Sequence, residues 1–215
     1  MWHTIFSWFV KITGAPVFYL LMRTKVYYEN RKVQGLRIKG KAIIVSNHRS
    51  IWDVAMMMMT FLGRTLRCVV AEVMYRFGIM RLVLHGLGAI KVDRHAQDFA
   101  FIDRCKTILD NGGVVEIYPE ARIPDPEEAK PLPFKPSTVY LALESGAPII
   151  PVYTNGCYFK WKRARMIIGT PFDAREYYDD ALSEKENIEN ITNLLRERII
   201  DLGKQLDEKI HEKHN

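Results

Sequence analysis

The stretch AIIVSNHRSIWD, residues 42–53, runs from an apolar, β-rich segment through a polar segment toward a second apolar one. Residues 42–45 predict a buried strand, and the apolar residues 54–62 have the spacing of a helix. Ser46 and Asn47 favour loops and helix caps, so a short loop is expected between the two elements. A strand, a loop and a helix in this order are typical of α/β proteins.

The same alternation continues over most of the chain. Further strands are expected at residues 66–71, 89–92, 114–118, 149–153 and 166–169, and further helices at residues 73–84, 97–109 and 138–144. Apolar residues between positions 188 and 210 recur with a period close to that of a helix and predict a long amphipathic one. We therefore expect a single α/β domain with a mixed, largely parallel sheet flanked by helices.

The composition restricts the classes of protein and partner. With 215 residues, 48% of them hydrophobic, the chain can bury one sizeable core but is short for two domains. The net charge of +6 and the pI near 9.2 indicate an anionic partner, which could be a membrane surface, a nucleic acid or a phosphorylated substrate. Cys68, Cys105 and Cys157 lack the spacing of a disulfide framework or a zinc site, which favours a reducing compartment.

The first 22 residues are rich in large apolar and aromatic side chains, interrupted by Lys11 and by a Gly-Ala-Pro break at 14–16. A spanning helix needs about 20 consecutive apolar residues, so an anchor that lies in the plane of the membrane fits better. Basic residues follow at positions 23, 25, 31 and 32, where anionic lipids would attract them. Residues 1–35 are therefore expected to be a membrane-associating helical segment that precedes a domain at 36–215, the alternative being a terminal helix that covers the core.

His48 and Asp53 are candidates for general-base catalysis. The ordinary pKa of histidine, about 6.5, lets it accept a proton near neutral pH, and a nearby carboxylate fixes its tautomer and stabilises the imidazolium. Side chains five positions apart do not share one face of a helix, so the pair requires His48 at the end of a loop and Asp53 in the first helical turn. The alternative is a helix-capping aspartate beside an unrelated histidine.

Three further stretches combine a predicted strand with charged residues or prolines: GAIKVDR at 88–94, EIYPEAR at 116–122 and APIIPV at 147–152. Together with NHRSIWD at 47–53, they resemble, in order, the four sequence blocks of the 1-acylglycerol-3-phosphate acyltransferase family of glycerolipid acyltransferases. Four blocks in the expected order are far more specific than any one of them. Two positions depart from the family pattern, because Ala121 and Ser137 replace glycines.

The resemblance implies an enzyme of phospholipid biosynthesis. His48 would deprotonate a hydroxyl of the acceptor, whose oxygen would attack the thioester carbonyl of acyl-CoA or acyl carrier protein, while Asp53 orients the imidazole. The acceptor 1-acylglycerol 3-phosphate would give phosphatidic acid, and glycerol 3-phosphate or another lysophospholipid is the alternative acceptor. No cofactor is implied. The expected partners are lipid and an anionic bilayer surface rather than nucleic acid, at the cytoplasmic face of a membrane.

The same resemblance supplies candidates for substrate binding. Arg94 and Arg122 would hold the acceptor phosphate, because a guanidinium can bind phosphate through two parallel hydrogen bonds. Lys91 and Lys135 would add positive charge. Glu120 would accept a hydrogen bond from a glycerol hydroxyl or position an arginine.

Other classes of protein have less support. The sequence contains no GxSxG, GxxxxGK[ST], GxGxxG or HExxH pattern, which argues against a serine hydrolase, a nucleotide enzyme and a metalloenzyme. A basic peripheral membrane protein that keeps an inactive acyltransferase fold is the alternative without catalysis. The presence of both His48 and Asp53 argues against it.

Overall fold

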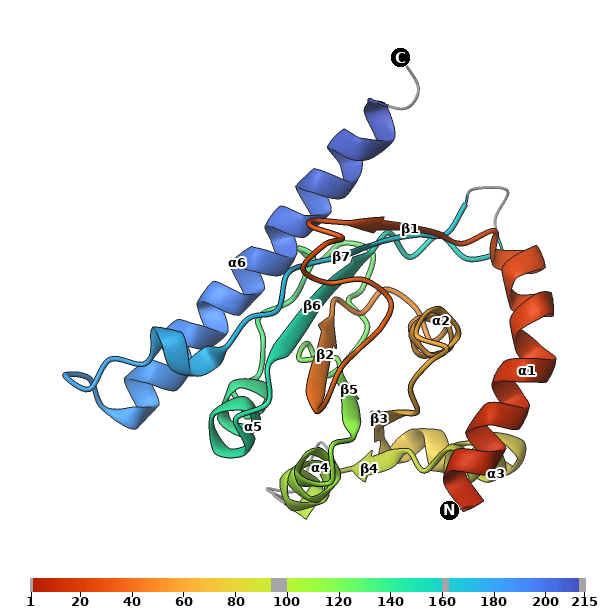
Figure 1. Cartoon of the computed structure of the whole chain (residues 1–215), viewed down its shortest axis with the longest axis horizontal. Coiled ribbons are helices and arrows are strands. Elements are labelled where there is room, and N and C mark those ends of the chain that lie inside the picture. The colour runs from red at the N-terminus through yellow and green to blue at the C-terminus, as the bar shows by residue number, and fades with distance from the viewer. Residues whose placement is uncertain (1, 94–99, 160–162, 213–215) are drawn as a thin grey trace.

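The computed structural model describes residues 2–93, 100–159 and 163–212, and within them seven strands form one sheet with helices on both faces (Figure 1). The strands are β1 (Lys25–Tyr28), β2 (Ala42–Ser46), β3 (Leu66–Ala71), β4 (Ile90–Val92), β5 (Val114–Ile117), β6 (Ile149–Thr154) and β7 (Arg165–Ile168). Their order in the sheet is β1-β7-β6-β2-β5-β3-β4, and neighbouring strands are parallel except for β6 and β7. The expected mixed, largely parallel sheet is therefore confirmed.

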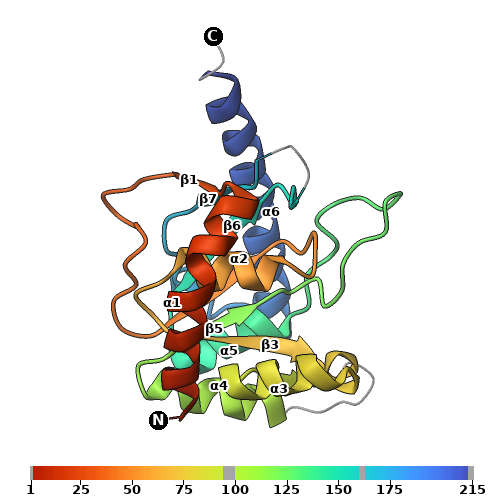
Figure 2. The same cartoon turned by 90° about the vertical axis from the view of Figure 1, so that its right-hand side faces the viewer.

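Hydrophobic cores fill the space between the helices and both faces of the sheet. The helices are α1 (Trp2–Met22), α2 (Asp53–Thr60), α3 (Gly78–Leu87), α4 (Ala100–Asp110), α5 (Ser137–Ser145) and α6 (Glu184–His211), with short 3₁₀ turns η1 (Glu72–Arg76) and η2 (Ala174–Tyr177). Ile43 and Val45 of β2 belong to the core formed with α4, α5 and α6, whereas Ala42 and Ile44 belong to the core formed with α1 and α2. Successive side chains of a strand point to opposite faces, so an apolar run is buried on both sides. Figure 2 shows α1 and α2 in front of the sheet and α6 behind it.

Helix α1 continues through Pro16, so the expected break at 14–16 is wrong. A proline inside a helix removes one backbone hydrogen bond, and here its ring lies on the exposed side of the helix. The other side packs against the protein through Ser7, Lys11, Ala15, Phe18 and Met22, whose spacing of three and four residues places them on one face. The exposed side carries large hydrophobic side chains, namely Trp2, Ile5, Trp8, Phe9, Ile12, Val17, Tyr19, Leu20 and Leu21. We call this side the apolar face of α1.

Lys11 fixes α1 to the end of α2. Its buried ammonium group donates hydrogen bonds to the carbonyl oxygens of Phe61 at 3.0 Å, of Leu62 at 3.4 Å and of Arg64. These carbonyls lie at or just beyond the C-terminus of α2, where a positive charge complements the helix dipole. Burial lowers the pKa of Lys11 from 10.5 to about 8. One side of α1 is thus tied to the protein by a specific polar contact as well as by packing.

Differences from the expected elements lie mainly at the edges of the sheet. β1 was not expected; it pairs in parallel with β7 and brings residues of the 1–35 segment into the sheet. The helix expected at 73–84 is divided at Phe77 into η1 and α3. The long C-terminal helix is present as α6 and starts with a capping box formed by Ser183 and Glu186.

Candidate active site

The candidate site lies where three parallel strands end. β2 is paired in parallel with both β5 and β6, so the carboxyl ends of these strands meet at one edge of the sheet. His48 follows β2, Tyr118 follows β5, and Thr154 is the last residue of β6. Asn47 joins two of the strand ends, because its side chain donates to the Thr154 carbonyl at 3.0 Å and accepts from the Thr154 N–H at 2.8 Å. Ligand sites in such sheets usually lie at this edge.

His48 and Asp53 form the hydrogen-bonded pair that the sequence predicts. His48 lies in the loop after β2, Asp53 is the first residue of α2, and Nδ1 of the imidazole is 2.9 Å from Oδ2 of the carboxylate. The Asp53 side chain is 0% exposed and that of His48 is 18% exposed. The same Oδ2 accepts backbone N–H groups from Arg49 at 2.6 Å and Ser50 at 2.8 Å, as an ionised carboxylate does. Nδ1 therefore carries the proton, and Nε2, left free by the hydrogen bonds of the described residues, is the basic nitrogen.

Tyr158 and Thr154 hold the second oxygen of Asp53. The Tyr158 hydroxyl donates to Oδ1 at 2.5 Å and the Thr154 hydroxyl at 3.4 Å. Burial, together with the negative charge of Asp53 and this hydrogen bond, raises the pKa of Tyr158, so its hydroxyl remains a donor. The carboxylate is thus fixed from both sides, and so is the orientation of the imidazole. Sequence reasoning missed both residues.

Tyr118 and Glu116 lie behind the imidazole. The rings of Tyr118 and His48 are stacked, with centroids 4.4 Å apart and an interplanar angle of 28°. The Tyr118 hydroxyl donates a hydrogen bond to Oε1 of Glu116, which lines a small apolar cavity with Val54 and Met58. Burial raises the pKa of Glu116 from 4.5 to about 8, so this carboxyl group is mostly protonated at neutral pH. A charged residue type inside the apolar run VVEIY was the signal in the sequence that could have revealed this arrangement.

Glu120 has a different surrounding from the one expected for a substrate ligand. Its side chain is buried, Oε1 accepts the backbone N–H of His48 at 2.6 Å, and Oε2 accepts that of Leu132 at 2.7 Å. Both oxygens therefore bind the protein itself, and Glu120 connects the loop that carries His48 to the loop at 123–136. The next residue, Ala121, has a φ of 61° in the left-handed region, which explains why glycine is the residue of the family pattern at this position.

The expected cationic ligands are spread around the site. Arg122 is exposed and forms a bidentate ion pair with Glu128, in which the two guanidinium nitrogens lie 2.6 and 2.5 Å from the two carboxylate oxygens. Lys135 is exposed beside the third block, where its backbone N–H donates to the Pro119 carbonyl at 2.8 Å. Lys91 lies on the edge strand β4, separated from β2 by β3 and β5, and pairs with Glu72 at 2.9 Å. Arg94 lies outside the described residues.

Arg49 is a cation of the site that sequence reasoning missed. It follows His48 directly, and its side chain packs against Gly156, where an added Cβ would lie 2.5 Å from the Cβ of Arg49. Its positive charge also acts on Glu120, where it partly offsets the effect of burial, which raises the pKa of that carboxyl. Arg49 therefore lies closer to the imidazole along the chain than any cation that the sequence predicted.

Apolar side chains form the rim of the site. Ile51 and Trp52, in the turn between His48 and α2, are exposed. The Trp52 ring meets the exposed Phe159 ring edge to face, with centroids 4.7 Å apart. A basic imidazole beside cations and an apolar rim suits an acceptor with both a phosphate and a hydrocarbon chain.

The profile of a protein family described as Acyltransferase matches residues 23–155, which is more than half of the chain. The chain belongs to the acyltransferase family. This confirms the resemblance drawn from the four blocks. Human 1-acyl-sn-glycerol-3-phosphate acyltransferase beta is 29% identical over 152 residues, which are 69% of this acyltransferase and 51% of the human protein, so the chain spans about half the length of that curated relative.

A solved structure supports the fold of the acyltransferase. The crystal structure of the 1-acyl-sn-glycerophosphate (LPA) acyltransferase PlsC from Thermotoga maritima superimposes with a TM-score of 0.64 at 18% sequence identity. The match covers 90% of this chain and 78% of the other. At this identity the likeness establishes the α/β architecture alone.

Proposed function

We propose that this acyltransferase moves a fatty acyl group from a thioester donor, acyl-CoA or acyl carrier protein, to a hydroxyl of 1-acylglycerol 3-phosphate, giving phosphatidic acid. The observation that carries the proposal is the His48–Asp53 pair. The proton on Nδ1 of His48 leaves Nε2 as a base at the carboxyl ends of the parallel strands, where ligands usually bind. The family match and the human relative support the same reaction class.

The proposed reaction needs one general base and no covalent enzyme intermediate. Nε2 of His48 takes the proton from the acceptor hydroxyl as its oxygen forms a bond with the thioester carbonyl carbon. The carbon–sulfur bond then breaks, and the leaving thiolate takes the proton back from the imidazolium. Asp53 stabilises the imidazolium between these steps, and such general-base catalysis contributes roughly 10² to 10⁴-fold in rate.

Arg122 would bind the acceptor phosphate together with Lys135 and Arg49. Arg122 is paired with Glu128 at the exposed surface, where ion pairs contribute little stability, so a phosphate can replace the carboxylate at small cost. A guanidinium that already holds a carboxylate through two parallel bonds has the geometry that phosphate requires. The Glu128 carboxylate would then act as a competitor of the substrate.

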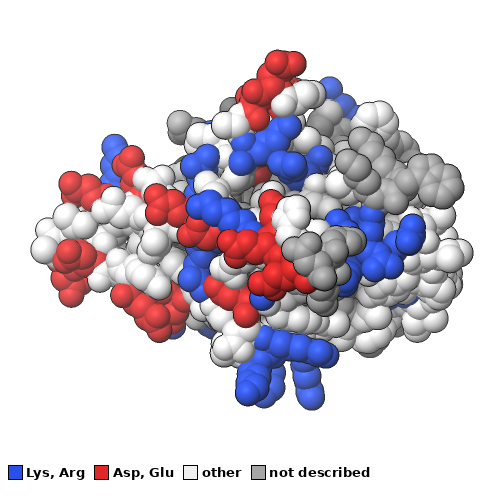
Figure 3. Space-filling view, turned by 90° about the horizontal axis from the view of Figure 1, so that it is seen from above, with Lys and Arg blue, Asp and Glu red and all other residues white. Residues whose placement is uncertain are grey.

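Membrane association at the cytoplasmic face is part of the same proposal. Helix α1 has the length and hydropathy of a membrane-crossing helix, but one of its sides is packed against the protein, which favours an orientation along the bilayer surface. Its apolar face and the apolar rim of the site would both meet lipid. Figure 3 shows basic side chains in separate groups with acidic ones between them, which favours local anion sites over one extended basic surface.

A panel of acceptors tests the proposed substrate. Purified protein would be incubated with one radiolabelled acyl-CoA and, in separate reactions, lysophosphatidate, glycerol 3-phosphate or lysophosphatidylcholine. Labelled phosphatidic acid from lysophosphatidate is expected to form fastest, because only this acceptor has both a phosphate monoester and an acyl chain. Faster acylation of lysophosphatidylcholine would overturn the role given to the arginines, and faster acylation of glycerol 3-phosphate would overturn the role given to the apolar rim.

A further inference from the structure

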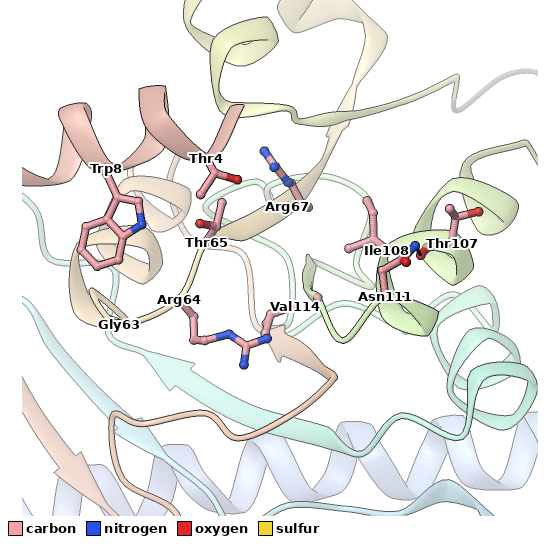
Figure 4. A pocket seen from close by; sticks show the side chains of 11 residues that line it. Thr4, Trp8, Gly63, Arg64, Thr65, Arg67, Thr107, Ile108, Asn111 and Val114 are labelled. Carbon is pink, nitrogen blue, oxygen red and sulfur yellow. Dashed lines mark hydrogen bonds between the residues drawn. The ribbon is translucent and has the colours of Figure 1, made fainter. Parts of the chain in front are cut away.

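A second cleft, with a volume of about 510 Å³, lies between α1, the start of β3 and the end of α4 (Figure 4). Thr4 and Trp8 of α1 lie at one side, Thr107 and Asn111 of α4 lie at the other, and two arginines lie between them. Its lining consists of Thr4, Trp8, Gly63, Arg64, Thr65, Arg67, Thr107, Ile108, Asn111, Gly113 and Val114.

This cleft is separate from the catalytic centre. It is lined by residues at the amino-terminal ends of two strands, Arg67 in β3 and Val114 in β5. His48 follows the carboxyl end of β2, which is parallel to β5, and β5 is in turn parallel to β3. The cleft therefore lies at the amino-terminal ends of the parallel strands, and the imidazole lies at their carboxyl-terminal ends.

The cleft has the charge and the donors of an anion site. Arg64 donates to the carbonyls of Ile38 at 3.4 Å and Gly112 at 2.5 Å, and Arg67 donates to the carbonyl of Leu87 at 2.5 Å. These contacts fix both guanidinium groups without neutralising them, and in the described part of the chain no carboxylate lies within 4.0 Å of either as an ion pair. The described lining contains no aspartate or glutamate, and the hydroxyls of Thr4 and Thr65 add neutral donors. The Thr107 hydroxyl instead donates to the Asp103 carbonyl at 2.8 Å, and the Asn111 amide donates to the Thr107 carbonyl at 2.7 Å. Arginine donors in excess of their carbonyl partners favour phosphate, which accepts several hydrogen bonds at once.

Trp8 connects the cleft to the apolar face of α1. Its ring is 43% exposed, and it belongs both to the lining of the cleft and to the apolar face, next to Ile5, Phe9 and Ile12. Tryptophan prefers the level of the lipid headgroups, between water and hydrocarbon. The two guanidinium groups point in different directions, so each offers its own anion contact (Figure 4). A phosphate bound at either arginine could thus be joined to hydrocarbon chains that follow α1, a combination that a phospholipid offers and a soluble phosphate does not.

We propose that this cleft binds the phosphate group of an anionic phospholipid at a site distinct from the catalytic centre. The inference rests on the membrane association proposed above, because it uses the apolar face of α1. The bound lipid fixes how α1 lies on the bilayer, and with it the orientation of the catalytic edge of the sheet.

Co-sedimentation with vesicles tests the proposal on the full chain. Vesicles of phosphatidylcholine alone measure the contribution of the apolar face, and vesicles that also contain phosphatidylglycerol measure the additional binding due to anionic headgroups. The double variant Arg64→Gln/Arg67→Gln is expected to lose about tenfold or more of this additional binding, since each basic residue near an anionic surface contributes severalfold in affinity. The matched control Lys185→Gln/Lys209→Gln removes the same charge from α6 and is expected to keep it.

A second variant separates binding from folding, because both arginines also support backbone carbonyls. Thr4→Glu adds a carboxylate to the cleft in the first turn of α1, where a negative charge favours the helix, and it should abolish the additional binding. Wild-type protein that gains nothing from phosphatidylglycerol, or a control variant that loses as much as the arginine variant, would overturn the site. Release of wild type from the anionic vesicles by excess inorganic phosphate would show a site for soluble phosphate and overturn the lipid assignment. Failure to bind phosphatidylcholine alone would instead count against the apolar face.

Discussion

The substitution Glu116→Gln tests whether a protonated carboxyl group lies behind His48. Glutamine keeps the size of the side chain and an oxygen that can accept the hydrogen bond of Tyr118, so it removes the ionisation and little else. Glu116 is a residue of β5, and its buried side chain lines the small apolar cavity near α2. Its Oε2 has no hydrogen-bond partner in the described part of the chain. Ionisation in this place would leave a charge away from water.

The magnitude follows from the shift of the Glu116 pKa. Burial raises this pKa from 4.5 to about 8, so the folded protein keeps a proton that the unfolded chain loses. The contribution of Glu116 to the free energy of unfolding is therefore largest below pH 4.5 and is lost as the pH rises to about 8. The full shift corresponds to a loss on the order of 5 kcal/mol in the free energy of unfolding across this window. The variant, which cannot ionise here, should not suffer this loss.

Urea unfolding followed by circular dichroism at pH 5, 7 and 9 measures the effect. The difference between variant and wild type in the free energy of unfolding should increase steadily with pH in favour of the variant. Glu189→Gln on the exposed side of α6 serves as the control, and its difference from wild type should stay constant. If the Glu116→Gln difference is also the same at pH 5 and pH 9, Glu116 is ionised in the folded protein and the reasoning is refuted.

Three further predictions concern the third block and the N-terminal helix. Glu128→Gln should lower the KM for the acceptor because it frees Arg122, whereas Arg122→Ala should raise it; steady-state kinetics showing the same direction for both would contradict the proposed competition. Ala121→Gly should raise the free energy of unfolding by about 0.5–1 kcal/mol, because glycine adopts the left-handed backbone conformation of this position without the strain that alanine has there. An unchanged midpoint of urea unfolding would contradict this backbone strain. Ile12→Asp/Leu20→Asp should release the protein from phosphatidylcholine vesicles without unfolding it, since both side chains are exposed, and undiminished co-sedimentation would exclude the apolar face as the anchor.

The centre of the fold could be predicted from the sequence because its strands are apolar on both faces. Residues 42–45 and 149–153 are continuous hydrophobic runs with polar residues directly after them, and such runs identify both the strand and the edge at which it presents ligands. The loop position of His48 and the helical position of Asp53 followed from their spacing. The Acyltransferase profile covers this same region.

Features that depend on contacts between distant parts of the chain could not be predicted. β1 is a short edge strand with the sequence KVYY, which has neither a long apolar run nor clear alternation. Tyr158 reaches Asp53 across 105 positions, and nothing in its local sequence indicates this contact. The resemblance implied that Glu120 accepts from a glycerol hydroxyl or positions an arginine, and nothing in the local sequence indicates that its oxygens accept two backbone N–H groups from different loops.

The rate of acyl transfer from acyl-CoA to lysophosphatidate tests the central claim most directly. It would be measured for wild type, for His48→Ala, and for His85→Ala, which removes an exposed histidine from α3. We predict that His48→Ala lowers kcat by about 10² to 10⁴-fold while His85→Ala leaves it unchanged. Equal rates for wild type and His48→Ala would contradict the assignment of His48 as the base, and the absence of transfer by wild type would favour an inactive acyltransferase fold.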